Sequence, residues 1–318
     1  MSKLRIVYMG TPDFAVFPLR TLMEEGFEVV GVVTNPDKPV GRGQKIRESP
    51  VKIFAREAGL PVLQPFSFKD EGFLESLGYW NADLQVVVAF KMLPESVWNM
   101  PCLGTINLHA SLLPDYRGAA PINRAIMNGE CETGVTTFLL SANMDEGNIL
   151  YSEKVAIAED MTAGELHDIL MEKGARLLVK TLRSMEKGEV APISQKSLLG
   201  GRLPTPAPKI FKEDMHVDWT KPGRDVYNLI RGLSPYPAAW TEFVTGGKSL
   251  HVKIFSAEFL PWDHNGDCGN MESDGKTYLR VNVPDGKISI KELQVAGKRR
   301  MAVEEFLRGF DISKIIIV

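Results

Sequence analysis

Three polar residues in the first half of the chain have the types and spacing for acid–base and oxyanion chemistry. Asn107 and His109 end an apolar run, GTINLH (104–109), and Asp145 ends a later one, VTTFLLSANMD (135–145). An amide and a protonated imidazole can donate hydrogen bonds to an oxygen that gains charge, and a neighbouring carboxylate would orient the ring. Two plainer explanations remain open, namely strand-end capping by His109 and a turn at Asp145.

These side chains can act together only if the elements that carry them end at one edge of a sheet. Short β-branched runs alternate with amphipathic stretches, which predicts an α/β, Rossmann-like, mostly parallel sheet. The expected strands are 4–9, 28–34, 84–90, 104–109 and 134–140. Ligands of such sheets bind beyond the carboxyl ends of the strands, and strand residues two apart share a face. We therefore expect Asn107 and His109 to project into one crevice.

The length of 318 residues and the distribution of turn residues predict two domains. Ser49 and Pro50 are typical of a helix start, and Thr162 with Glu165 has the spacing of a capping box before a long helix. We expect a catalytic domain over 1–189 and a proline-rich and glycine-rich linker over 190–207. Alternating runs in 208–318 predict a small antiparallel barrel or sandwich.

Composition restricts the class of protein. Hydrophobic residues make up 44% and charged residues 24% of the chain, as in soluble globular proteins. The start of the chain lacks the pattern of a signal peptide, and no apolar stretch is long enough to cross a membrane, so we expect a cytoplasmic protein. Three scattered cysteines form neither a disulfide framework nor a metal pair. With a net charge of −3, any nucleic-acid partner requires a local basic patch.

Longer motifs around these residues resemble the folate-dependent formyltransferases. They are NLHASLLPDYRGAAPI (107–122), MDEGNIL (144–150), GTPDFAVFPL (10–19), TNPDKPVGRGQK (34–45), SPVKIFAREAGLPVLQP (49–65) and RGLSPYPAAWT (231–241). The resemblance covers nearly the whole chain and implies that Asn107, His109 and Asp145 are the catalytic triad. It also implies that the C-terminal domain is an OB-like barrel. Two positions depart from the family pattern, Glu146 and Asp115.

The resemblance narrows to members that use 10-formyltetrahydrofolate to formylate the α-amine of methionine on initiator tRNA, in support of translation initiation. The alternative within the family is a small amine acceptor, such as a purine precursor or an amino sugar. The reaction implies no metal and no covalent enzyme intermediate. We also expect a monomer.

The folate co-substrate is expected against the loop 89–95, AFKMLPE, and against the segment after His109. The residues proposed to bind it are Phe90, Met92, Leu93, Ser111, Leu112, Leu113 and Pro114. Apolar side chains and backbone groups there could sandwich a pterin ring. The alternative is that they only pack beneath the loop.

The tRNA is expected to contact a basic, glycine-punctuated segment, 35–52, with one further contact in the C-terminal domain. The candidates are Lys38, Arg42, Lys45, Arg47 and Lys209. Phosphates attract such clusters, although a charged run is often only a solvated face.

Two other classes of protein fit less well. A nicotinamide-dependent oxidoreductase requires a GxGxxG turn, where this chain has Gly10-Thr11-Pro12. A non-catalytic RNA-binding module would leave Asn107, His109 and Asp145 without a role.

Overall fold

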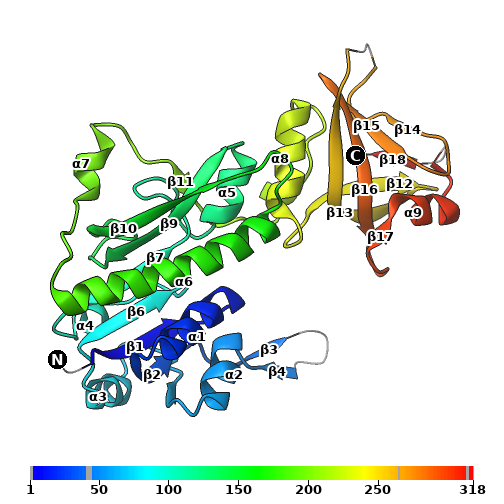
Figure 1. The fold of residues 1–318 in the computed structure, drawn as a ribbon. Coiled ribbons are helices and arrows are strands. Elements are labelled where there is room, and N and C mark those ends of the chain that lie inside the picture. Colours follow the sequence, from blue (N-terminus) through cyan, green and yellow to red (C-terminus); the bar gives the residue numbers. More distant parts are fainter. Residues whose placement is uncertain (1–2, 41–44, 264–265, 313–314, 318) are drawn as a thin grey trace. The chain divides into compact units, whose positions relative to one another are not determined.

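The structure is a computed structural model that describes residues 3–40, 45–263, 266–312 and 315–317 (Figure 1). Its contacts divide the chain into two compact units. The first comprises Met1–Gly118, Thr133–Ala156 and His167–Ala207, and the second comprises Ala119–Glu132, Ile157–Leu166 and Pro208–Val318.

The first unit is built on a seven-stranded sheet with the spatial order β10-β9-β7-β6-β1-β2-β5. The strands are β1 (Arg5–Gly10), β2 (Glu28–Val33), β5 (Val62–Leu63), β6 (Leu84–Val88), β7 (Thr105–His109), β9 (Glu132–Leu139) and β10 (Ile149–Ala156). From β5 to β7 every neighbouring pair is parallel, and β9 joins β7 in the antiparallel direction. This confirms the predicted Rossmann-like, mostly parallel sheet, with each expected strand within two residues of its position.

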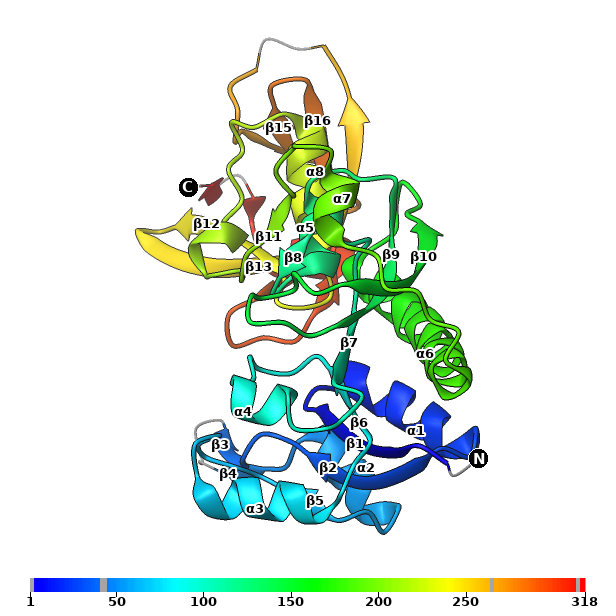
Figure 2. The ribbon, with the colours of Figure 1, turned by 90° about the vertical axis from the view of Figure 1, so that its left-hand side faces the viewer.

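Helices cover both faces of this sheet, as Figure 2 shows. They are α1 (Val16–Glu24), α2 (Pro50–Glu57), α3 (Glu71–Tyr79), α4 (Glu95–Trp98) and α6 (Ala163–Lys187). On one face Val7 and Val87 pack with Phe73 of α3 and Val97 of α4. On the other, Leu108 lies so close to Gly174 of α6 that a Cβ there would be 2.9 Å from its side chain. Since Leu108 faces α6, the alternation of β7 turns Asn107 and His109 to the opposite face.

Local hydrogen bonds explain where the helices begin. The Ser49 hydroxyl accepts a hydrogen bond from the Lys52 amide, and Pro50 is the first residue of α2. Glu165 accepts from the Thr162 amide while its own amide donates to the Thr162 hydroxyl, which is the reciprocal pairing of a capping box. Both predicted helix starts are confirmed.

The second unit contains a nearly closed antiparallel sheet, which confirms the predicted barrel-like domain. Its strands are β12 (Ala239–Thr245), β13 (Lys248–Pro261), β14 (Met271–Ser273), β15 (Leu279–Val283), β16 (Gly286–Val295), β17 (Met301–Ala302) and β18 (Ile315–Ile317). The barrel encloses a buried apolar core that includes Phe243, Ile254 and Phe306. The helices of this unit are α5 (Pro121–Met127), α8 (Gly223–Leu233) and α9 (Val303–Gly309). Among the described residues, no helix combines the length and apolar character required to span a membrane.

Candidate active site

Asn107 and His109 lie at the carboxyl end of β7, and Asp145 comes close to the histidine. His109 Nε2 is 2.9 Å from the carbonyl oxygen of Tyr116. A carbonyl only accepts, so Nε2 carries a proton, and the other ring nitrogen, Nδ1, lies 4.0 Å from Asp145 Oδ2. The sequence analysis expected Asp145 to orient the ring of His109; in the structure the Tyr116 carbonyl also holds the ring and fixes its tautomer.

The three side chains differ in the freedom that the fold leaves them. His109 is only 7% exposed and Asp145 9% exposed, whereas Asn107 is half-buried. Within the described part of the chain, the Asn107 amide has no hydrogen-bond partner, so its donors are available to a ligand. The site therefore combines a fixed imidazole and carboxylate with a free amide.

The loop that carries Asp145 is tightly constrained. The φ angle of Asp145 is 53°, which is unusual for a residue with a side chain, and its Oδ2 accepts a hydrogen bond of 3.0 Å from the Gly118 amide. A Cβ on residue 147 would lie 1.5 Å from the carbonyl oxygen of Leu139, so only glycine fits there. The loop is both the predicted turn and the holder of the carboxylate.

Gln195 holds the Asp145 loop in place. The sequence did not predict this role. Gln195 is 2% exposed, and its Nε2 donates to the carbonyl oxygens of Asp145 (2.8 Å) and Gly147 (2.7 Å). Its Oε1 accepts from Nε and Nη2 of Arg117, whose Nη1 donates to Glu146. The departure at Glu146 is thus accommodated by an ion pair. A single glutamine has no spacing signal, so nothing in the sequence pointed to it.

The segment 190–207, which we expected to be a linker, contains two short regular elements. It includes α7 (Gln195–Leu199) and β11 (Pro206–Ala207), and β11 pairs with β8 (Arg117–Gly118). In the same region Arg202 forms an ion pair with Asp115, the second departure from the family pattern. The Arg202 guanidinium holds the pKa of the Asp115 carboxyl below its usual value, with help from the Thr205 amide. This segment therefore braces the loop that follows His109.

The residues predicted to bind folate differ in what they can offer a ligand. Leu93, Ser111, Leu113 and Pro114 are buried, and the Ser111 hydroxyl is already bonded to the Asp115 carbonyl. Phe90 and Leu112 are half-buried, and Met92 is 62% exposed. Apolar contact with a ligand can thus come from Phe90, Leu112 and Met92, with the buried residues beneath them.

The residues predicted to bind tRNA are only partly described. Lys38 and Arg47 are exposed and face each other across the hairpin of β3 (Lys38–Val40) and β4 (Lys45–Arg47). Arg42 lies outside the described residues, as does the side chain of Lys45. Lys209 belongs to the second unit, where its ammonium lies 5.6 Å from the ring centre of Phe211.

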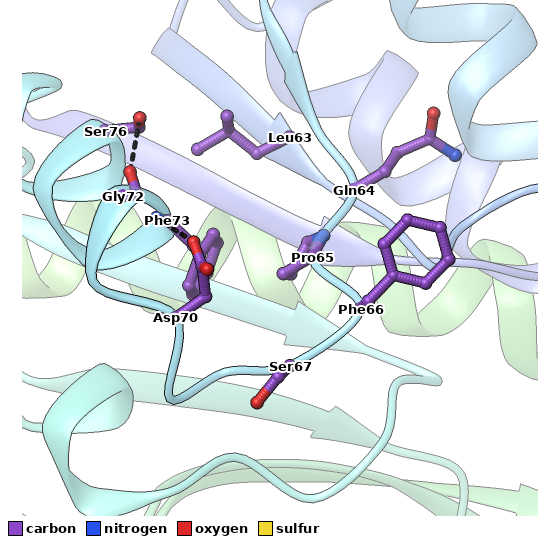
Figure 3. A pocket seen from close by; sticks show the side chains of 9 residues that line it. All are labelled: Leu63, Gln64, Pro65, Phe66, Ser67, Asp70, Gly72, Phe73 and Ser76. Atoms are coloured by element: carbon purple, nitrogen blue, oxygen red, sulfur yellow. Dashed lines mark hydrogen bonds between the residues drawn. The ribbon is translucent and has the colours of Figure 1, made fainter.

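A separate pocket of about 390 Å³ lies at the carboxyl end of β5 (Figure 3). Its lining does not include Asn107, His109 or Asp145, so it is distinct from the catalytic candidates. No cluster of three potential metal ligands was found within the described ranges.

Comparisons with known proteins agree on one family. The model described as "Formyl transferase" matches residues 4–182, and the model "Formyl transferase, C-terminal domain" matches 209–311. The methionyl-tRNA formyltransferase of Bacteroides fragilis is 53% identical over 98% of this chain and 96% of its own length. That of Bacteroides thetaiotaomicron is 54% identical, over 98% and 97%.

A solved structure supports the fold independently. The sugar 3N-formyl transferase WlaRD, whose structure was determined in the presence of dTDP and 5-N-formyl-THF, superposes with a TM-score of 0.66. The match covers 94% of this chain and all of that one, at 19% sequence identity. At that identity the likeness concerns the fold alone.

Proposed function

This chain belongs to the formyl transferase family, and we propose that it transfers the formyl group of 10-formyltetrahydrofolate to the α-amine of methionyl-initiator tRNA. The near-complete match to proteins named for that activity supports the choice of acceptor. One structural observation supports this chemistry. The imidazole of His109 is buried and lies between the Tyr116 carbonyl and the Asp145 carboxylate.

In the proposed reaction the neutral amine attacks the formyl carbon, and a tetrahedral centre with a negatively charged oxygen forms. The free amide of Asn107 and the Nδ1–H of protonated His109 donate hydrogen bonds to that oxygen. The tetrahedral centre then collapses, the bond from the formyl carbon to N10 of the folate breaks, and N10 takes up the proton that the attacking nitrogen has given to Asp145. Each donor fixed in a site of this kind contributes about 3–4 kcal/mol of transition-state stabilisation.

Asp145 has two tasks in this scheme. Its carboxylate, 4.0 Å from His109 Nδ1, helps to orient the imidazole, and it accepts the proton that the attacking nitrogen loses, directly or through a water molecule. The amine needs little activation, because the ordinary pKa of an α-amine is about 8 and a neutral fraction exists near pH 7. Electrostatic stabilisation is therefore the main contribution, and proton transfer is secondary.

The co-substrate and the tRNA are assigned to the surfaces described above. We place the pterin against Phe90, Met92 and Leu112, over the buried Leu93, Ser111, Leu113 and Pro114. The tRNA phosphates are assigned to Lys38 and Arg47 of the hairpin, with Arg42 and Lys45 of the same segment and Lys209 of the second unit.

Purified protein incubated with 10-formyltetrahydrofolate and methionyl-initiator tRNA tests the proposal directly. We expect formyl-methionyl-tRNA from the wild type, and about 100-fold to 1,000-fold lower kcat for Asn107→Ala and for His109→Ala. His167→Ala, which removes a partly exposed histidine elsewhere in the first unit, is the matched control and should keep full activity. Full turnover by His109→Ala, or formylation only of a small amine, would contradict the proposal.

A further inference from the structure

The pocket at the end of β5 has the composition of a site for a flat, amino-bearing ring. Phe66 and Gln64 project on one side of it, and Asp70, Phe73 and Ser76 line the other (Figure 3). Phe66 is 92% exposed, which is unusual for so large an apolar side chain. Proteins that bind single-stranded nucleic acids use aromatic rings as stacking surfaces for the bases.

Asp70 adds a polar preference to this pocket. Its Oδ1 accepts the hydrogen bond that caps α3, from the Phe73 amide at 2.8 Å. Its Oδ2 has no hydrogen-bond partner among the residues that the structure describes. A carboxylate oxygen accepts but does not donate, so it favours a ring with an exocyclic amino group, as in adenine, cytosine and guanine.

Two lysines beside the pocket lack acidic partners. The Lys91 ammonium lies 4.3 Å from the ring centre of Phe68, and that ring packs against Phe73 of the pocket wall at 5.7 Å. Burial, together with the nearby charge of Lys38, lowers the pKa of Lys91. Neither lysine forms an ion pair within the described ranges, so the two cations are placed to receive an anion.

The acidic residues that flank the β3–β4 hairpin, Asp37 and Glu48, already have a cationic partner. Lys52 forms ion pairs with both Asp37 and Glu48. Gln64, which lines the pocket, donates to Asp37 and to the carbonyl of Asn35, and so ties the pocket to the base of the hairpin. The aromatic pocket and the cationic pair therefore form one continuous surface.

We propose that this surface binds an unpaired nucleotide of the RNA substrate near its aminoacylated end, with the base against Phe66 and a phosphate at Lys38 and Lys91. The inference rests on the proposed function. Four strand spacings separate β5 from β7, which is about 19 Å. A few unpaired nucleotides span that distance, and the carboxyl ends of β5 and β7 lie on the same edge of the sheet.

The tail of the folate is the main competing occupant. It also carries an aromatic ring and anionic groups, and Lys91 belongs to the loop assigned to the pterin, between Phe90 and Met92. Both occupants carry anionic groups that Asp70 repels and the two lysines attract, and a base adds an exocyclic amino group that can donate to Asp70. This hydrogen-bond donor favours a nucleotide.

Phe66→Ala and Phe66→Trp test the site with two acceptors, methionyl-initiator tRNA and methionine esterified to adenosine alone. For Phe66→Ala we expect kcat/KM with the tRNA to fall about 10-fold, while the short acceptor and the KM for 10-formyltetrahydrofolate are unaffected. Phe66→Trp keeps a stacking surface and should stay near the wild type. Tyr79→Ala is the control, because it also removes an exposed aromatic ring, in this case one at the end of α3 that does not line the pocket.

The outcomes separate this site from the proposed function. A wild type that does not formylate the tRNA overturns both. An active wild type with an unchanged Phe66→Ala variant overturns only the nucleotide site. Equal losses with both acceptors, or a raised KM for the folate, would assign the pocket to the co-substrate or to folding instead.

Discussion

The carboxyl ends of β7 and β5 are two parts of one sheet edge that are built in opposite ways. At β7 the imidazole of His109 and the carboxylate of Asp145 are almost completely buried, and Gln195 donates a hydrogen bond to the backbone of the Asp145 loop. At β5 the side chain of Phe66 is almost fully exposed, and Lys38 and Lys91 have no carboxylate partner in the described part of the chain. At the β7 end the imidazole and the carboxylate have partners within the protein, whereas at the β5 end the exposed ring and the two lysines have no ionic partner among the described residues.

This contrast corresponds to two physical requirements. Stabilising a charge that exists only in the transition state depends on dipoles that are already oriented, because reorientation during the reaction costs free energy. Binding a flexible RNA end depends on exposed aromatic rings on which bases can stack, and on cationic side chains that no carboxylate neutralises. Mutations at β7 should therefore change kcat, and mutations at β5 should change KM for the RNA.

The largest effect is expected from adding one methyl group at the β7 end, with the same change in α3 as the comparison. Gly147→Ala forces the Leu139 carbonyl and the Asp145 loop apart, and we expect kcat/KM to fall about 100-fold as the carboxylate is displaced. Gly78→Ala in α3 places its Cβ in open space and should leave activity unchanged, with stability higher by about 0.5–1 kcal/mol. Steady-state formylation measures the activity of the two variants, and urea unfolding measures their stability. Full activity of Gly147→Ala would show that the Asp145 loop is not rigid.

A smaller and more specific effect is expected from two glutamines that each donate to backbone carbonyls. Gln195→Leu leaves the carbonyls of Asp145 and Gly147 without their donor, and we expect kcat to fall about 10-fold to 100-fold at nearly constant KM. Gln64→Leu loosens the base of the hairpin and should raise KM for methionyl-tRNA a few-fold at constant kcat. If both variants changed the same parameter, the division of roles between the two ends would be wrong.

The two ends of the sheet edge also show which features could be predicted from the sequence and which could not. Short-range signals were sufficient for the strands, for the Ser49 and Thr162 helix starts, and for the placement of Asn107 and His109 at a strand end. They were insufficient for Gln195, because its partners lie 48 and 50 residues away and a buried glutamine leaves no periodic pattern. The role of the Tyr116 carbonyl was also missed, since backbone acceptors carry no residue-type signal.

The smallest effect concerns a paired carboxylate at each end, Asp115 beside the catalytic loop and Asp37 beside the hairpin. Hydrogen bonds from Arg202 to Asp115 and from Lys52 to Asp37 lower the pKa of each carboxyl below its ordinary value. The unfolded chain therefore binds more protons near and below pH 4, so stability is lost as the pH falls through that range.

Because the Arg202 side chain is 51% exposed, solvent screening keeps the contribution of the Asp115 pair to stability small. Asp115→Asn should consequently lower stability at pH 7 slightly and reduce the further loss between pH 7 and pH 3, as measured by urea unfolding. Asp37→Asn should flatten the same curve while leaving kcat unchanged, whereas Asp115→Asn should also lower kcat, because its carboxylate braces the loop beside His109. If the stability of the wild type and of both variants changed equally with pH, neither Asp115 nor Asp37 would contribute to the pH dependence.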